Sequence, residues 1–307
     1  MNYKNKVTII GAGMVGSTTA YTLVVSGLAE EIALIDINKN LVRSQVMDLQ
    51  HSFPFFGYTK IKVGSYQDLK DSEVVIVTCG ATQGKGKTRL DLVRQNSKIV
   101  KEVVPNIFKQ NPEIIVVMVT NPVDILTYLA VKMFPKKKNQ ILGSGTMLDS
   151  ARFRFLLGER LKVNPKSIHA YIVGEHGDSE LPLWSTASVG NAPIDKLKKF
   201  SFLEKKEIFE RAKNAAYTII EGKQATYYAI AACSAKIIKA ILFNKKTVLP
   251  LSHLMEGEYG IYNVCLSLPV VLGAGGIIKR IKPPISKGEQ KLLKISAQKL
   301  KKVATKI

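Results

Sequence analysis

Short runs of consecutive apolar residues alternate with amphipathic segments through the first half of the chain. The apolar runs are VTII (7–10), IALIDI (32–37), VVIVTC (74–79), IIVVMV (114–119) and QILG (140–143). Because each run is apolar at consecutive positions, it predicts a strand buried on both faces, as in a parallel sheet. The segments between them predict helices at about 15–28, 40–50, 90–109 and 122–134. Strands and helices in alternation indicate a doubly wound α/β sheet with right-handed crossovers.

The pattern changes after about residue 145. A predicted helix at about 146–161 precedes short strand-like pieces, two long helical segments at about 201–222 and 224–243, and hairpin-like strands over 247–273. This mixture is typical of an α+β unit. We therefore expect a doubly wound α/β domain over residues 1–145 and an α+β domain over residues 146–307. Without a proline-rich linker between them, the two should share a sizeable interface.

Length and composition exclude several classes of protein. The 307 residues are 46% hydrophobic, and no apolar run approaches the roughly 18 residues of a membrane span. Three cysteines (Cys79, Cys233 and Cys265) lie far apart among apolar neighbours, which favours free thiols in a reducing compartment and gives no zinc-ligand spacing. We expect a soluble, cytoplasmic protein without a metal or a membrane partner.

The net charge of +21 raises the question of nucleic-acid binding, since a basic surface attracts polyanions. The most basic segment, 279–307, also carries Leu292, Ile295, Leu300 and Val303 at helical spacing. Its lysines are therefore expected on the solvated face of an amphipathic helix. No nucleic-acid motif accompanies the charge, so no specific nucleic-acid partner is expected.

A glycine-rich turn follows the first predicted strand. Gly11, Gly13 and Gly16 in GAGMVG match the pattern GxGxxG, and Asp36 follows at the end of the second strand. Glycines at these positions permit a tight turn and the close approach of a pyrophosphate to a helix N-terminus, while an acid at the second strand accepts hydrogen bonds from a ribose diol. Because the acid would repel a 2′-phosphate, the pattern predicts NAD rather than NADP. A turn needed only for packing is the weaker alternative.

Three further residues form a candidate acid/base site. Asp149 and Arg152 are three apart on a predicted helix and so share a face, and His176 follows an apolar strand in VGEHGDSE. Taken alone, each has an ordinary interpretation as a surface ion pair or a lone histidine. Together, the carboxylate could fix the imidazole tautomer while Arg152 binds a substrate carboxylate with its two-pronged guanidinium.

Seven motifs in order resemble the L-lactate dehydrogenases of the lactate/malate dehydrogenase superfamily, from about residue 6 to residue 300. They are GAGMVGS, Asp36, GATQGKGKTRLDLV, VTNPVD, LDSARFR, GEHGDSE and ATYYAI. The resemblance implies a Rossmann domain with a second catalytic domain, and reversible NADH-dependent reduction of pyruvate to L-lactate, the last step of fermentative glycolysis. It makes a catalytically silent dinucleotide-binding protein the lesser alternative.

The resemblance also implies individual roles. His176 is the proton donor to the pyruvate carbonyl, oriented by Asp149; Arg152 holds the substrate carboxylate; Arg89 arrives with a closing loop, GATQGKGKTR (80–89), and polarises the carbonyl. The remaining substrate-binding positions are Gln83, Asn121 and Thr226. The cofactor-binding positions are Gly11, Gly13, Val15, Gly16, Asp36, Gly80, Ala81, Asn121, Ser144 and Ile230.

Gln83 bears on the choice of substrate. In the superfamily this position is typically glutamine in lactate enzymes and arginine in malate enzymes, and a second substrate carboxylate left without a cation in a closed pocket would cost several kcal/mol. Lys85 and Lys87 depart from the proline and glutamate common in the lactate enzymes. Their charge favours tolerance of dicarboxylates, so malate dehydrogenase or a broader 2-hydroxy-acid dehydrogenase is the alternative.

Arg154 and His169 suggest regulation. They stand two residues after Arg152 and seven before His176, where bacterial lactate dehydrogenases of this kind bind fructose 1,6-bisphosphate across a subunit interface. The resemblance thus implies an allosteric homotetramer. The alternative is that both are ordinary polar residues of the second domain.

Overall fold

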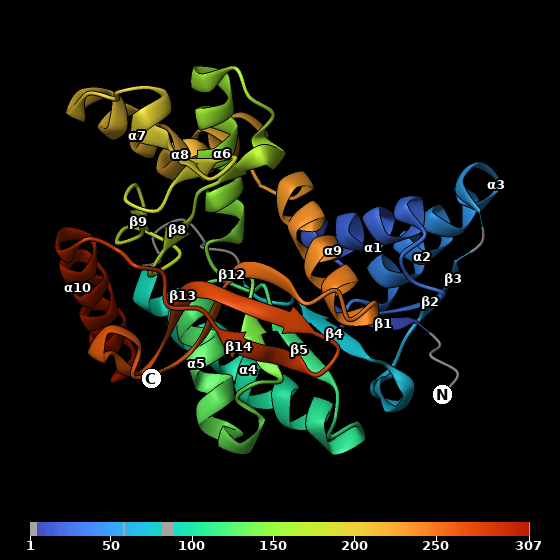
Figure 1. The fold of residues 1–307 in the computed structure, drawn as a ribbon. Coiled ribbons are helices and arrows are strands. Elements are labelled where there is room, and N and C mark those ends of the chain that lie inside the picture. The colour runs from blue at the N-terminus through green and yellow to red at the C-terminus, as the bar shows by residue number, and fades with distance from the viewer. Residues whose placement is uncertain (1–4, 58, 82–88, 307) are drawn as a thin grey trace.

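A mixed, mostly parallel sheet forms the centre of the molecule. The computed structural model describes residues 5–57, 59–81 and 89–306, and within them the central sheet has nine strands in the order β14-β13-β12-β6-β5-β4-β1-β2-β3 (Figure 1). Its parallel strands are β1 (Lys6–Ile10), β2 (Glu31–Ile35), β3 (Lys60–Val63), β4 (Val74–Val77), β5 (Ile115–Met118) and β6 (Ile141–Gly143). The doubly wound α/β class is confirmed, and so are the five predicted strands, with bounds that differ from the predicted ones by one or two residues.

Helices cover both faces of these parallel strands (Figure 1). The helices of this half are α1 (Met14–Ser26), α2 (Lys39–His51), α3 (Phe53–Phe56), α4 (Arg89–Gln110) and α5 (Val123–Met133), with 3₁₀ turns η1 (Tyr66–Asp71) and η2 (Pro135–Lys137). Of these, the short α3 packs on α1 and α2. One apolar core joins the strands to α1, α2 and α9 (Tyr228–Leu242), and a second joins the opposite face to α4 and α5. The strands are apolar at consecutive positions because both of their faces are buried.

The long strands of the second half extend this same sheet. β12 (Thr247–Glu256), β13 (Tyr262–Gly273) and β14 (Gly276–Arg280) form an antiparallel set, and β12 joins β6 where Ser252 pairs with Gly143. A Cβ on Gly143 would lie 2.6 Å from Thr127 Oγ1 and 3.0 Å from the Ser252 Cβ, so only glycine permits this junction. The two halves of the chain are therefore joined by one continuous sheet.

The rest of the second half packs over one end of the sheet (Figure 1). Its helices are α6 (Met147–Leu161), α7 (Ile194–Leu197), α8 (Phe202–Lys223) and α10 (Lys287–Ala304), with 3₁₀ turns η3 (Pro165–Ser167) and η4 (Glu258–Gly260). Its short strands are β7 (Ile168–His169), β8 (Ile172–Val173), β9 (Leu181–Pro182), β10 (Ser188–Val189) and β11 (Ala192–Pro193). Among the described residues, no helix is long and apolar enough to cross a membrane.

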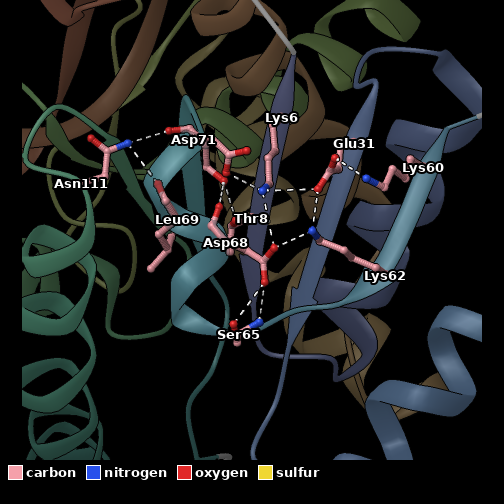
Figure 2. A network of polar contacts seen from close by, with 11 residues as sticks. Lys6, Thr8, Glu31, Lys60, Lys62, Ser65, Asp68, Leu69, Asp71 and Asn111 are labelled. Atoms are coloured by element: carbon pink, nitrogen blue, oxygen red, sulfur yellow. Dashed lines mark hydrogen bonds and ion pairs between the residues drawn. The ribbon is translucent and has the colours of Figure 1, made fainter.

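A network of ion pairs lies at the amino-terminal edge of the parallel strands (Figure 2). The ammonium of Lys6 lies 2.5 Å from Asp71, 3.3 Å from Glu31 and 3.5 Å from Asp68, with only 3% of its side chain exposed. Lys62 reaches Glu31 at 2.8 Å and Asp68 at 2.6 Å. The acids thus surround a buried cation at the end of the sheet opposite the glycine-rich turn, where they join β1, β2 and β3 to η1.

Candidate active site

The glycine-rich turn has the shape needed to admit a pyrophosphate. Gly11 has a φ of +111°, and a Cβ at Gly16 would lie 1.8 Å from the carbonyl oxygen of Gly11, so neither position tolerates a side chain. At Gly13, by contrast, a Cβ would meet nothing within 4 Å. Gly13 is the N-cap of α1 and offers no side chain to the first amides of that helix. This turn therefore leaves an open, electropositive helix end, which fits the diphosphate of NAD.

Asp36 lies beside this turn, as the sequence predicts. One carboxylate oxygen accepts from the backbone N–H of Ala12 at 2.7 Å and the other from Asn38 at 2.8 Å. These bonds hold the carboxylate in place, and each ionised oxygen keeps a further lone pair. The arrangement fits the recognition of a ribose diol next to the diphosphate position.

Asn96 of α4 organises the predicted cofactor positions Gly80, Ala81 and Asn121. Its side-chain oxygen accepts from Ala81 N at 2.8 Å, and its amide donates to Asn121 O at 2.7 Å. A Cβ on Gly80 would lie 2.4 Å from Thr120 Cγ2, so the two segments approach closely. Asn96 is 1% exposed. Its two hydrogen bonds link the segments that follow the parallel strands β4 and β5.

The other predicted cofactor positions, and the predicted substrate position Thr226, lie close to the starts of α1, α6 and α9. Val15 of α1 and Ile230 of α9 are partly buried and pack against one apolar core. Ser144 is buried just after β6, where its N–H donates to Met118 O at 2.9 Å. Thr226 lies half-buried in the connection between α8 and α9.

The three candidate acid/base residues come together. Asp149, in the first turn of α6, is 2% exposed; its Oδ1 accepts from Arg152 Nη1 at 2.9 Å, and its Oδ2 lies 2.6 Å from His176 Nδ1. The carboxylate therefore contacts the arginine and the histidine at once. Asp149 contacts neither His176 Nε2 nor the second terminal nitrogen of Arg152 in these two bonds, so both atoms can make further contacts.

The charges of this group control the titration of His176. Burial alone would lower the pKa of His176, but the attraction of Asp149 and their hydrogen bond outweigh it and raise the pKa to about 9. Burial would likewise raise the pKa of Asp149, yet the neighbouring His176 and Arg152 hold it below its ordinary value. At neutral pH the imidazole is thus protonated and ready to donate a proton.

The backbone around His176 is held from three sides. Its N–H donates to Asp124 Oδ2 of α5 at 2.7 Å, and the N–H of Glu175 donates to Ser296 Oγ of α10 at 2.9 Å. Gly174 exchanges two backbone hydrogen bonds with Ser267 of β13, at 2.9 and 2.8 Å. Both Asp124 and Ser296 are buried. The loop that carries the histidine is therefore fixed by elements distant in sequence.

A second buried acid, Glu180, adjoins the pair. It is 7% exposed, and ligand atoms of Asp149, His176 and Glu180 all lie within 4.8 Å of one another. That spacing could hold a cation, but both oxygens of Asp149 already contact Arg152 and His176. The cluster is better suited to holding protons, and the expectation of a metal-free site stays a prediction.

Arg154 lies on α6 and His169 on β7. Arg154 follows Arg152 by two helical positions and interacts with Tyr171, while His169 is exposed on β7. His169 and Tyr171 alternate with the buried Ala170, so they point to the same side. The charge of Arg154 thus acts on a residue two positions from His169.

Some predicted residues lie outside the described part of the chain. Gln83, Lys85 and Lys87 belong to the segment 82–88, and the side chain of Arg89 is also outside it. Their roles stay predictions.

Four supporting residues escaped sequence reasoning: Asn96, Asp124, Glu180 and Ser296. Asp124 and Glu180 belong to the motifs VTNPVD and GEHGDSE. An acid within the largely apolar helix PVDILTYLAV could have indicated a buried carboxylate with a specific partner. Asn96 and Ser296 carried no such signal, since isolated polar residues on amphipathic helices are ordinary.

Comparisons with known proteins identify the family of this chain. Residues 5–143 match the family model "lactate/malate dehydrogenase, NAD binding domain", and residues 146–307 match "lactate/malate dehydrogenase, alpha/beta C-terminal domain". The L-lactate dehydrogenase of Acetivibrio thermocellus is 46% identical over 97% of this chain and 96% of its own length. That of a Thermoanaerobacter species is 45% identical over 97% of this chain and 98% of its own.

Solved structures show the same similarity in three dimensions. A ligand-bound minor L-lactate dehydrogenase from Enterococcus mundtii superposes with a TM-score of 0.95 at 36% identity, covering 98% of both chains. A lactate dehydrogenase from a deep-sea metagenome of the Medee basin gives 0.94 at 38% identity, covering 97% of both. The chain belongs to the lactate/malate dehydrogenase family.

Proposed function

We propose that this protein is an L-lactate dehydrogenase that interconverts pyruvate and L-lactate with NAD as its cofactor. The observation that carries the proposal is the contact of Asp149 with both Arg152 and His176, because it places a protonated imidazole beside a carboxylate-binding cation. A 2-keto acid needs both, one for each of its two functional groups. The lactate dehydrogenases that align along nearly the whole chain support the same activity.

Each group has a part in the reduction of pyruvate. NADH, when bound, supplies a hydride to the carbonyl carbon. His176 donates its proton to the carbonyl oxygen, and Asp149 stabilises the imidazolium beforehand and holds its Nδ1, which leaves Nε2 for the substrate. Arg152 binds the substrate carboxylate, and Arg89 polarises the carbonyl. In the reverse direction, neutral His176 accepts the hydroxyl proton of lactate.

The remaining positions keep their proposed roles around the cofactor and substrate. Asn121 and Thr226 line the substrate, while Gly80, Ala81, Ser144, Val15 and Ile230 contact the cofactor. Gln83 selects pyruvate, because its neutral side chain cannot pair with the second carboxylate of oxaloacetate. We place the boundary between the cofactor domain and the catalytic domain at residue 145.

Regulation by fructose 1,6-bisphosphate is a further part of the proposal. Burial lowers the pKa of Lys236 most, and the positive charges of Arg154 and Lys166 lower it further, so both lie near Lys236. With His169 nearby in sequence, this group offers several donors to a phosphate. The proposal includes a cytoplasmic homotetramer in which the sugar bisphosphate binds between subunits.

Steady-state rates decide between the candidate substrates. We expect NADH oxidation with pyruvate, a kcat/KM for oxaloacetate at least about a hundredfold lower, and little turnover of 2-ketoisocaproate. Faster turnover of oxaloacetate would make the protein a malate dehydrogenase. A pyruvate saturation curve unchanged by fructose 1,6-bisphosphate would remove the regulatory part and leave the rest intact.

A further inference from the structure

We propose that Glu180 is a positioning residue that must carry a proton for the pocket to bind a 2-keto acid anion, so that the substrate site titrates through two groups and not through His176 alone. The inference rests on the proposed function, because it concerns the charge that the pocket offers to a substrate carboxylate.

The placement of Glu180 is unusual for an acid. It is 7% exposed, and within the part of the chain that the structure describes its Oε1 has no hydrogen-bond partner. Its own backbone N–H donates to Gly177 O at 3.1 Å, which closes a turn that begins at the residue after His176. An ionised carboxylate in this position would lack the donors that normally stabilise a buried charge.

Within the described residues, charged groups from several elements act on Glu180. Asp149 and Arg152 come from α6, His176 comes from the same loop, and Lys213 comes from α8, where its ammonium also donates to Asp178 O at 3.0 Å. Asp124 of α5 lies next, bonded to the backbone of His176. The protonation of Glu180 therefore depends on both the negative and the positive charges of the site.

The charge of the pocket depends on the proton of Glu180. With Glu180 neutral, Asp149 contributes −1 while Arg152 and protonated His176 contribute +1 each, so the inner group has a charge of +1. That charge complements the single carboxylate of a monoanionic keto acid. With Glu180 ionised, the inner group is neutral, and the substrate anion also meets a carboxylate near His176.

The balance of these influences favours the neutral acid. Burial raises the pKa of Glu180 most, and Asp149 raises it further, while His176, Arg152 and Lys213 oppose the rise without cancelling it. Glu180 thus keeps its proton at neutral pH and loses it in the alkaline range, where His176 also titrates. The two groups release their protons in steps that belong to the pair.

The matched variants are Glu180→Gln, which copies the size of the neutral acid and cannot ionise, and Glu175→Gln, which removes a carboxylate from the same loop. For the purified full-length enzyme, kcat/KM for pyruvate is measured from about pH 6 to about pH 10. For the wild type and for Glu175→Gln, we expect kcat/KM to decline at alkaline pH with the loss of two protons, through a rise in KM. We expect a one-proton decline for Glu180→Gln, with kcat/KM at neutral pH within about fivefold of the wild type.

Two results would overturn the proposal. One is an alkaline decline of kcat/KM that involves the same number of protons in Glu180→Gln and in the wild type. The other is a loss of kcat/KM in Glu180→Gln beyond about a hundredfold at neutral pH, which would show that the ionised carboxylate is needed. If the wild type does not reduce pyruvate, the proposed function fails separately. In that case infrared spectroscopy of the free protein tests the proton on Glu180 directly. The band of a protonated carboxyl should disappear at alkaline pH in the wild type and be missing from Glu180→Gln.

Discussion

The backbone N–H of His176 donates a hydrogen bond of 2.7 Å to the side-chain Oδ2 of Asp124. Asp124 comes from the helix after β5, whereas His176 lies in a loop 52 residues later. Asp124 therefore fixes the backbone that carries the imidazole, whereas Asp149 contacts the ring itself.

Replacing Asp124 tests this support. We expect Asp124→Ala to lower kcat for pyruvate and to reduce the free energy of unfolding by about 1–3 kcal/mol, because the buried N–H of His176 loses its acceptor. Asp124→Asn keeps an acceptor oxygen and is the control. Urea unfolding and steady-state kinetics measure the two effects. Equal kcat for the alanine and asparagine variants would show that the bond does not position the histidine.

The pairing of Asp149 with His176 predicts a pH dependence. Asp149→Asn removes the charge that raises the pKa of His176 to about 9, so the pKa should fall to its ordinary 6.5 or below, since burial alone lowers it. The proton donor is then lost at neutral pH, and kcat/KM for pyruvate should drop by about 10²–10⁴-fold. The alkaline limb of its pH profile should move to lower pH. An unmoved limb would contradict the assignment of the raised pKa to Asp149.

The same pair links stability to pH. Because the folded pKa of His176 is raised above 6.5, its contribution to stability is fully present below pH 6.5 and is lost as the pH rises through about 9. The wild type should therefore lose its stability advantage over Asp149→Asn across this range. Thermal unfolding of both proteins at several pH values measures the difference.

Gly13 and Gly16 should respond differently to the same added methyl group. Gly13 has a φ of −68° and open space at its Cβ position, so Gly13→Ala should fold normally while hindering the diphosphate of NADH. In Gly16→Ala the methyl would lie 1.8 Å from Gly11 O, so the fold itself should be destabilised. NADH titration by fluorescence, together with melting temperatures, separates the outcomes. Unchanged NADH affinity in Gly13→Ala would place the diphosphate elsewhere.

The ion-pair network around Lys6 predicts a stability effect without a catalytic one. Lys6→Met leaves Glu31, Asp68 and Asp71 without their buried cation, so the free energy of unfolding should fall by about 3–5 kcal/mol while kcat is unchanged. Lys62→Met removes a cation that is 36% exposed and should cost less. Urea unfolding compares the two; an equal or larger loss in Lys62→Met would contradict the importance of burial.

Acid should weaken the same network. Burial would raise the pKa values of Glu31 and Asp68, but the lysines outweigh it and lower both to about 2. Their stabilising contribution is therefore present above the ordinary values of 4.5 and 3.8 and is lost as the pH falls through about 2.

Much of the fold could be predicted from local pattern, because buried parallel strands and amphipathic helices have distinct periodicities. β3 was missed because it is a short edge strand, KIKV, in which lysines alternate with apolar residues. The pairing of Ser252 with Gly143, which adds the later strands to the first sheet, depends on a close approach that one-dimensional patterns do not contain.

The site was predictable where a motif carried it. Asp149 and Arg152 share a helical face, so their contact follows from spacing, and Asp36 lies beside the glycine-rich turn because adjacent parallel strands end together. The bonds from Asp124 and Ser296 to the histidine loop join residues 52 and 121 positions apart. No local pattern encodes such distances, and the proton on Glu180 depends on burial that only the fold creates.

The contact between Ser296 and the loop of His176 has a consequence for which functions depend on α10. This helix supplies the hydroxyl that accepts from Glu175 N, and also the carboxylate of Glu289, which accepts from Ser185 N at 3.0 Å. Neither bond involves the glycine-rich turn or Asp36. Loss of α10 should therefore impair turnover more than dinucleotide binding.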